Sequence, residues 1–150
     1  MPEQRMIDAW ERLVRYHRTT TTAMNQHLRA TFDRSLDDYD VLHQLSIHGG
    51  PMRMGELAEQ LLVANSSCNR IVRHLVDGGF VERSHGETDR RVVLVNLTPT
   101  GKRLRRRMAA VHTRDIQARF GSPLSAVEVA QIDTILQRLL AAETESFDRD

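Results

Sequence analysis

Side chains that can form paired hydrogen bonds are concentrated between residues 65 and 74. An Asn amide matches the adenine edge, an Arg guanidinium matches guanine O6 and N7, and a Ser hydroxyl adapts to a base or a phosphate. On the outer face of a helix, Arg70 is therefore the first candidate to read a base, and Asn69 is the second. Arg73 and His74 suit backbone phosphates, which position a protein without reading sequence. The candidate DNA contacts in this segment are Asn65, Ser66, Ser67, Asn69, Arg70, Arg73 and His74.

A second group of charged residues occupies the loop between residues 84 and 91. This loop contains a glycine and joins two β-rich runs, Phe80 to Arg83 and Val92 to Leu97, which together predict a hairpin. Arg90 and Arg91 are candidates for insertion into a narrow A·T-rich minor groove, where the negative potential is enhanced. For the other polar residues, the alternative is an exposed loop tip with no further role.

The distribution of charge along the chain also favours a polyanionic partner. The 150 residues carry a net charge of only +1. Residues 70–107, however, contain ten Lys or Arg and four Asp or Glu, whereas residues 115–150 contain three and seven. Binding to nucleic acid requires such a concentration of positive charge. The arginines between 103 and 107, taken alone, are equally consistent with a solvated helix face.

Six helices and one hairpin are predicted to position these residues. Apolar residues spaced by three and four positions predict the helices. Capping signals predict their ends: Ser35, and Thr98 followed by Pro99, are helix starts, and Gly78 with Gly79 is a left-handed helix end. The expected helices are a long one in residues 1–34, one from Ser35 to Gly49, a short one around Leu57 to Leu62, one from Ser66 to Val76, one from Thr98 to about Phe120, and one that begins at the capping box of Ser125 and Glu128.

A short helix pair followed by a strand, a basic loop and a second strand is the plan of a winged helix-turn-helix. Such a unit places one helix in a major groove and a cationic loop on the minor groove or backbone beside it. The expected fold is therefore mainly α with a small β-hairpin wing. The first, fifth and sixth helices have more apolar surface than one winged unit can bury, which predicts an interface. The expected divisions are an N-terminal dimerisation helix (1–34), the winged helix-turn-helix (35–98) and C-terminal dimerisation helices (99–150), in one compact domain.

Three strings within this plan resemble the multiple-antibiotic-resistance regulator (MarR) family. They run from Leu75 to Arg83, from Asp89 to Val92 and from Leu97 to Gly101. The resemblance implies an obligate homodimer on palindromic double-stranded DNA. It also implies a small-molecule or redox signal that relieves repression.

The resemblance assigns roles within the wing. Asp89 is an acid in a cationic loop, and the family pattern implies that it pairs with Arg91 or Arg83 and holds the loop rigid. Arg91 stands at the arginine of the Asp-x-Arg pattern, so it is preferred to Arg90 for the minor groove.

Two positions depart from the family pattern just before the expected recognition helix. Ala64 stands where a capping Ser is usual, and Leu62 replaces a turn glycine. A lost cap costs about 1 kcal/mol unless Asn65 or Ser66 takes it over. The sequence therefore leaves the first residue of the expected recognition helix undetermined by one position. Capping and solvation is also an alternative role for Ser66 and Ser67, and it is favoured for Ser67.

An effector pocket is implied between the dimerisation helices and the winged unit. The expected occupant is a small aromatic or phenolic ligand. Ordinary packing is the alternative; it is favoured for Met24, and for His17 and His43 the two interpretations are nearly even. The candidate residues are His17, Thr21, Met24, Tyr39 and His43.

Other kinds of function have less support. Cys68 falls in register with apolar residues, so it is expected to be a small buried hydrophobe. It is the single cysteine of the chain, and the lack of a second cysteine for a disulfide suits a reducing cytoplasm. His43 and His48 are spaced so that they do not share a helical face, and no metal site is expected. No catalytic motif, cofactor or membrane span is expected either.

The expected function is that of a cytoplasmic, sequence-specific DNA-binding regulator. It would be a repressor that binds a palindromic operator as a homodimer and is released by a small-molecule effector. The alternatives are a metal-responsive or redox-responsive regulator of the same fold, and a winged-helix protein-interaction module.

Overall fold

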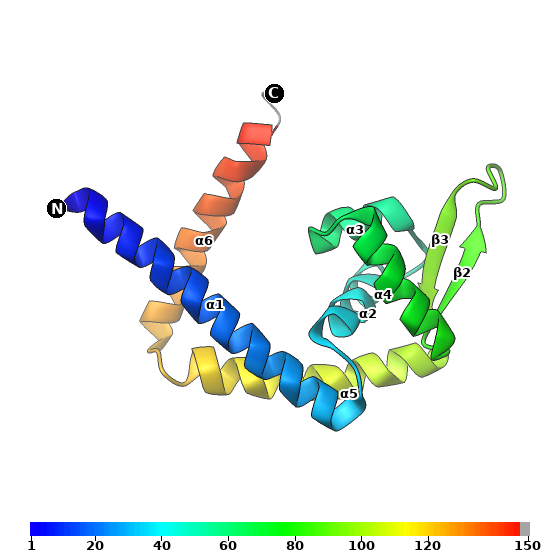
Figure 1. Ribbon diagram of the computed structural model, residues 1–150, viewed down its shortest axis with the longest axis horizontal. Coiled ribbons are helices and arrows are strands. Elements are labelled where there is room, and N and C mark those ends of the chain that lie inside the picture. Colours follow the sequence, from blue (N-terminus) through cyan, green and yellow to red (C-terminus); the bar gives the residue numbers. More distant parts are fainter. Residues whose placement is uncertain (148–150) are drawn as a thin grey trace. The chain divides into compact units, whose positions relative to one another are not determined.

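The computed structural model describes residues 1–147, which are mainly helical with one small antiparallel sheet (Figure 1). This architecture confirms the expected fold class. The chain divides into two compact units, residues 1–112 and 113–150. No helix in the described part of the chain combines the length and hydropathy of a membrane span. The elements are α1 (Pro2–Phe32), α2 (Leu36–His48), β1 (Met52–Arg53), α3 (Met54–Leu61), α4 (Asn65–Asp77), β2 (Val81–His85), β3 (Val93–Leu97), α5 (Pro99–Ile116), the π-helical turn η1 (Gln117–Gly121) and α6 (Ala126–Phe147).

Local capping hydrogen bonds set the starts of α2, α5 and α6, as predicted. At the start of α2, the Asp38 N–H donates to Ser35 Oγ (3.0 Å) and the Ser35 N–H donates to Asp38 Oδ2 (2.9 Å), which completes a capping box. The same reciprocal pair joins Ser125 and Glu128 before α6. At the end of α4, the left-handed residue is Gly79, with φ of 75°. The fifth helix ends at Ile116, four residues before the expected end, and η1 continues the coil to Gly121.

The turn between α3 and α4 contains Leu62 and Ala64, the two residues that depart from the family pattern. Leu62 ends α3 in the left-handed region, with φ of 55°, and its side chain is 90% exposed. Ala64 is the N-cap of α4, and no side chain caps the helix. The helix therefore begins at Asn65, one residue before the expected Ser66, and neither of these residues takes over the cap.

A serine at the N-cap is expected to stabilise the protein. Ala64 already has the extended backbone of an N-cap, with φ of −63° and ψ of 149°. A hydroxyl there can accept a hydrogen bond from a free N–H of α4, so Ala64→Ser should raise the free energy of unfolding by about 1 kcal/mol in urea titrations. The same change at exposed Ala30, inside α1, should lower it by a few tenths of a kcal/mol. Equal effects at the two positions would contradict the cap.

The sheet contains one strand more than the predicted hairpin. Its order is β1-β3-β2, all antiparallel. β2 starts at Val81 rather than Phe80 and extends to His85, which pairs with Val93. β1 has only two residues and pairs with β3 through Met52 and Val95. No sequence pattern marks so short a strand.

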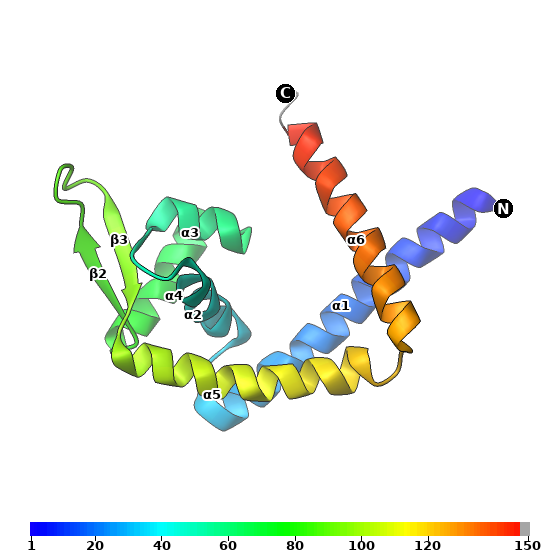
Figure 2. The ribbon, with the colours of Figure 1, turned by 180° about the vertical axis from the view of Figure 1, so that it is seen from behind.

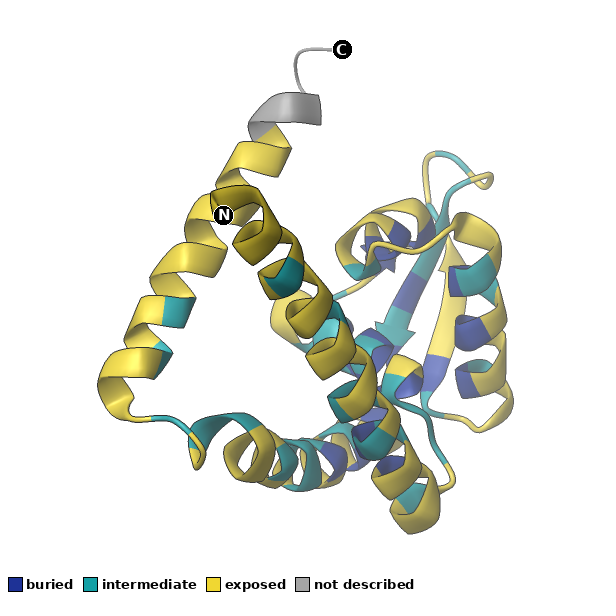
Figure 3. Cartoon of the chain, turned by 60° about the vertical axis from the view of Figure 1, so that its left-hand side comes forward, coloured by how far each residue is buried: buried dark blue, intermediate teal, exposed yellow. Residues whose placement is uncertain are grey.

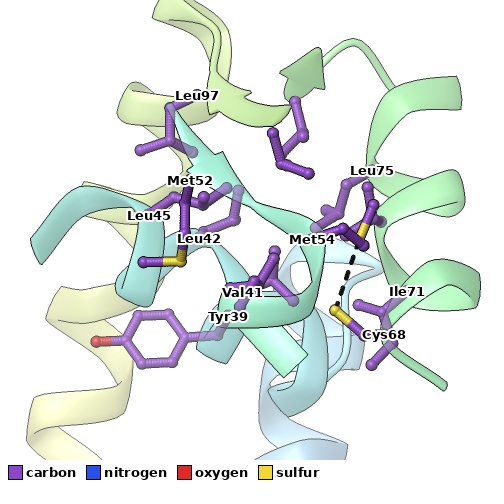
Figure 4. Close-up of a cluster of buried hydrophobic side chains, with 14 of the residues drawn as sticks. Tyr39, Val41, Leu42, Leu45, Met52, Met54, Cys68, Ile71, Leu75 and Leu97 are labelled. Carbon is purple, nitrogen blue, oxygen red and sulfur yellow. Dashed lines mark hydrogen bonds between the residues drawn. The ribbon is translucent and has the colours of Figure 1, made fainter. Parts of the chain in front are cut away.

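One apolar core within residues 1–112 holds α2, α3, α4, the sheet and the first half of α5 together (Figure 4). Leu42, Leu57 and Leu75 are fully buried in it. Cys68 is also fully buried, with its Sγ 3.8 Å from Met54 Sδ. Burial raises the pKa of the Cys68 thiol, and the charge of Arg83 opposes this only in part. The inward position predicted for this cysteine is confirmed.

β3 runs directly into α5 (Figure 2), and Thr98 is the residue between the two elements. Its hydroxyl accepts the Gly101 N–H (3.0 Å), which is the predicted N-cap, and donates to the Gly79 carbonyl (2.7 Å). Its own N–H donates to the Phe80 carbonyl (3.1 Å). One residue thus fixes the start of α5 against the end of α4 and the start of β2.

Candidate nucleic-acid interface

The outer face of α4 carries most of the predicted DNA contacts. Cys68, Ile71, Val72 and Leu75 form its buried stripe. The spacing of that stripe turns the polar positions outward. Of the predicted residues, those exposed are Asn65, Ser66, Arg70, Arg73 and His74, while Ser67 and Asn69 are half-buried.

Asn69 is already engaged inside the protein. Its Nδ2 donates to the Asn65 carbonyl (2.9 Å), and its Oδ1 accepts a hydrogen bond from the Arg83 guanidinium (3.2 Å). Pairing with adenine requires the amide to give up these bonds, because adenine needs both its donor and its acceptor. The geometry therefore favours Arg70 over Asn69 as the base reader.

Arg83 connects the wing to α4. It lies on β2, and its guanidinium reaches the Asn69 side chain of α4. Arg83 therefore does not pair with Asp89, which the family pattern allowed, but hydrogen-bonds to α4. Asp89 is paired with Arg91 instead.

The loop of the wing is held by bonds within itself. The Arg91 N–H donates to Asp89 Oδ1 (3.0 Å), and the Arg91 guanidinium donates to Oδ1 (3.2 Å) and Oδ2 (3.4 Å) of the same carboxylate. The backbone bond first, and then the side-chain bond, hold the pKa of Asp89 below its usual value. The Arg91 side chain is nevertheless 93% exposed. Asp89 therefore orients Arg91 and leaves it accessible to a groove.

Arg53 is a further cation near the wing, and it was not predicted from the sequence as part of the site. It lies on β1, is exposed, and its charge helps to lower the pKa of Asp89. Its proximity to the wing depends on the pairing of β1 with β3. That pairing was not predictable, so Arg53 was missed.

The predicted effector residues are only partly brought together. Tyr39 stacks on His43 (ring centroids 5.5 Å apart), and the His112 ring lies 4.8 Å from Tyr39. An Arg105 guanidinium nitrogen lies 3.3 Å from His43 Nδ1. We call Tyr39, His43, Arg105 and His112 the tyrosine cluster; the sequence suggested only its first two members. Among the residues of α1, Met24 is buried, His17 is exposed, and the Thr21 hydroxyl donates to the His17 carbonyl (2.6 Å).

The tyrosine cluster is partly desolvated and positively charged. Burial, followed by the charge of Arg105, lowers the pKa of His43, so a neutral imidazole accepts from Arg105 near neutral pH. Burial raises the pKa of Tyr39. The Nε of Arg105 is buried and has no hydrogen-bond partner among the described residues. A buried donor of this kind costs free energy until an acceptor reaches it.

Asp40 lies beside this cluster in the chain, and removing its charge is expected to stabilise the fold at neutral pH. Burial, followed by repulsion from Asp37, raises the pKa of Asp40 from 3.8 to about 6. The folded state thus favours the neutral acid. The contribution of protonated Asp40 to the free energy of unfolding is fully present below about pH 4 and is lost as the pH rises through 6. Asp40→Asn should therefore raise the free energy of unfolding at pH 7.5 by about 1 kcal/mol, a value reduced for the partial exposure of the side chain.

Urea titrations at pH 4 and pH 7.5 check this result. The gain from Asp40→Asn should vanish at pH 4, and Glu59→Gln, on the exposed face of α3, should change little at either pH. A gain that is equal at both pH values would contradict the raised pKa.

The described residues bear on the metal and redox alternatives as well. No group of three or more His, Cys, Asp or Glu within them is placed to hold a metal ion. Cys68 lies in the core, away from solvent. Neither alternative gains a site from the structure.

The fold and this surface are those of a winged helix-turn-helix. Residues 35–93 match the model of the MarR family. Over 72 residues it is 36% identical to YfiV of Bacillus subtilis (strain 168), an uncharacterised HTH-type transcriptional regulator. That match covers 48% of this chain and 44% of YfiV, less than half of its length.

Solved structures resemble the chain over most of its length. AbsC, a MarR family transcriptional regulator from Streptomyces coelicolor, is 25% identical, with a TM-score of 0.83 over 91% of this chain and 93% of AbsC. A mutant MarR from E. coli, solved in complex with operator DNA, is 24% identical, with a TM-score of 0.80 over 91% of this chain and 96% of that protein. At that identity the second likeness shows the fold alone.

Proposed function

We propose that the protein is a repressor that binds a palindromic operator as a homodimer and is released by a small-molecule effector. The observation that carries the proposal is the placement of Arg70 and Arg91. Arg70 is exposed on α4, and Arg91 is exposed on a wing that Asp89 orients. A helix for the major groove therefore stands beside an arginine for the minor groove. The MarR mutant solved with operator DNA has the same fold.

Exposed apolar side chains support the homodimer. The N-terminal half of α1 is mostly exposed (Figure 3). Trp10 is 65% exposed there, and Met6, Ile7, Leu13 and Tyr16 are exposed as well. On α6, in the second unit, the exposed apolar residues are Val127, Ile135, Leu136, Leu139 and Leu140. Apolar patches of this kind mark interfaces. α5 differs from the expectation, because Leu104 and Met108 are buried in the core.

A two-fold dimer would present two α4 helices to half-sites about one helical turn apart, roughly 34–36 Å. Light scattering should therefore give the mass of a dimer. Fluorescence anisotropy with a palindromic duplex should show an affinity that falls steeply as salt rises, because each neutralised phosphate releases counterions. A stable monomer, or an affinity that ignores both salt and symmetry, would overturn the proposal.

The tyrosine cluster supports release by an effector. It offers aromatic faces, the hydroxyl of Tyr39 and the buried Nε of Arg105, which has no acceptor among the described residues. A small aromatic or phenolic ligand with an acceptor group suits this chemistry. Such a ligand relieves repression only if it binds the geometry that does not fit DNA more tightly than the geometry that does.

The rival assignment, a winged helix that binds protein, is less well supported by this surface. Interface cores in protein complexes are depleted of charge and rich in aromatic residues. The exposed face of α4 instead carries Arg70, Arg73 and His74. This composition favours a nucleic acid.

A further inference from the structure

Leu62 is a leucine whose side chain the fold does not use. It ends α3 with φ of 55°, in the left-handed region where a Cβ is crowded and which glycine adopts freely. Its backbone is fixed there, because its own N–H donates to the Glu59 carbonyl (3.1 Å) and the Val63 N–H donates to the Ala58 carbonyl (3.2 Å). Its side chain is 90% exposed and adds nothing to the apolar core. The leucine therefore strains the turn without stabilising the protein.

Leu62 lies at the end of α4 that carries predicted DNA contacts. Residues 62–64 join α3 to α4, and residues 62–66 are all exposed. Asn65 and Ser66 are the first residues of α4 and are predicted to contact DNA. A helix that enters a major groove with its N-terminal residues brings the preceding turn close to the same base pairs. Leu62 thus borders the surface that is proposed to face the bases.

The chemistry of this turn suits a base edge better than a phosphate. Residues 60–69 contain no Lys, Arg, Asp or Glu, so the turn offers no cation to the DNA backbone. Val63 is only 37% exposed, so Leu62 presents most of the apolar surface. In the major groove, the apolar group is the C5 methyl of thymine. A protein partner is less well matched, because exposed Arg70 and Arg73 follow on α4 and protein interface cores are depleted of charge.

We propose that Leu62 packs against the C5 methyl group of a thymine in each half-site of a palindromic operator, and that it determines specificity together with Arg70. The inference rests on the proposed function and adds to it an apolar contact that reads thymine. Strained residues cluster at binding sites, where the strain serves recognition. Binding removes the leucine and the methyl group from water together, which stabilises the complex.

Leu62→Gly tests the contact from the protein side, because its expected effects on stability and on binding have opposite signs. Glycine relieves the left-handed backbone, so the Tm without DNA should rise by about 2 °C. The duplex is a palindrome that the full chain itself selects from a random pool. Affinity for it, measured by fluorescence anisotropy, should fall about tenfold, because each of two half-sites loses a contact worth about one buried methyl group. Ile47→Ala, at a side chain that is 65% exposed on α2, should keep the affinity within about twofold.

Deoxyuridine tests the contact from the DNA side. Each thymine of the half-site is replaced in turn, in both half-sites at once, which removes only the C5 methyl group. At one position the change should weaken binding of the original protein about tenfold. The same change should leave the affinity of Leu62→Gly nearly unaltered, because the partner of the methyl group is already missing. Arg70→Gln is the matched control and should still respond to this deoxyuridine as the original protein does, because its own contact is a separate one.

The outcomes distinguish the thymine contact from the proposed function. If no palindrome is selected, the repressor function fails and the thymine contact fails with it. If a palindrome is selected but no deoxyuridine position depends on Leu62, the DNA-binding function stands and the thymine contact is wrong. Unchanged affinity of Leu62→Gly would lead to the same conclusion, as would an equal loss in Ile47→Ala. A fall in Tm with equal losses on the thymine and deoxyuridine duplexes would mean that Leu62 supports the fold and does not read thymine.

Discussion

Arg70→Gln combined with Arg91→Gln is expected to weaken binding to a palindromic operator by roughly a thousandfold. Each of these two arginines should contribute about 2 kcal/mol to the free energy of binding, and the loss of both amounts to about 4 kcal/mol. The two residues lie on different elements, α4 and the wing, so their losses should be close to additive. Fluorescence anisotropy at a fixed salt concentration measures the effect.

The single variants should differ in character. Arg70→Gln should reduce discrimination between the operator and an unrelated duplex, because its role is to read a base. Arg91→Gln should mainly lower the steepness of the salt dependence. Arg114→Gln, an exposed arginine near the end of α5, is the matched control and should bind as the original protein does. If the double variant keeps its affinity while remaining dimeric, α4 and the wing do not contact DNA as proposed.

Gly101→Ala is expected to destabilise the fold by about 3 kcal/mol or more. A Cβ at this position would collide with the backbone carbonyl oxygen of Phe80 and lie 2.8 Å from its carbonyl carbon. That carbonyl is fixed because it accepts the Thr98 N–H (3.1 Å), so neither backbone can move away without breaking the junction between the hairpin and α5. Overpacking against a fixed group costs this much.

The sign of this effect makes the test decisive. Gly101 lies in the first turn of α5, where helix propensity alone predicts that alanine stabilises. Gly55, in the first turn of α3, is the control, because a Cβ there meets nothing within 4 Å. Gly55→Ala should therefore raise the free energy of unfolding by up to about 1 kcal/mol in urea titrations. Stabilisation by both changes would show that the contact with Phe80 is not tight.

Gly101 also explains part of the family resemblance. The string from Leu97 to Gly101 was recognisable in the sequence, but its physical reason was not. Thr98 caps α5 and bonds to Gly79, while Gly101 lets α5 approach the backbone of Phe80. The motif therefore fixes the base of the wing to the start of α5 and the end of α4.

The order of the elements and most of their ends could be predicted from the sequence, because the bonds that define them are local. The capping boxes at Ser35 and Ser125 join groups three residues apart, and the Asp89–Arg91 pair spans two. Side chains so close along the chain meet in almost any compact fold that contains the helix or the turn. The outward face of α4 followed in the same way from the spacing of its apolar residues.

Contacts between distant residues were decided by the tertiary structure alone. Arg105 meets His43 across 62 residues, and Arg83 meets Asn69 across 14. β1 exists because β3 offers it a hydrogen-bonding edge, and only that pairing brings Arg53 to the wing. Such contacts depend on how whole elements pack, and no short-range pattern encodes the packing. The chain's residue types thus determined which chemistry is available, and the packing decided which side chains remain free to perform it.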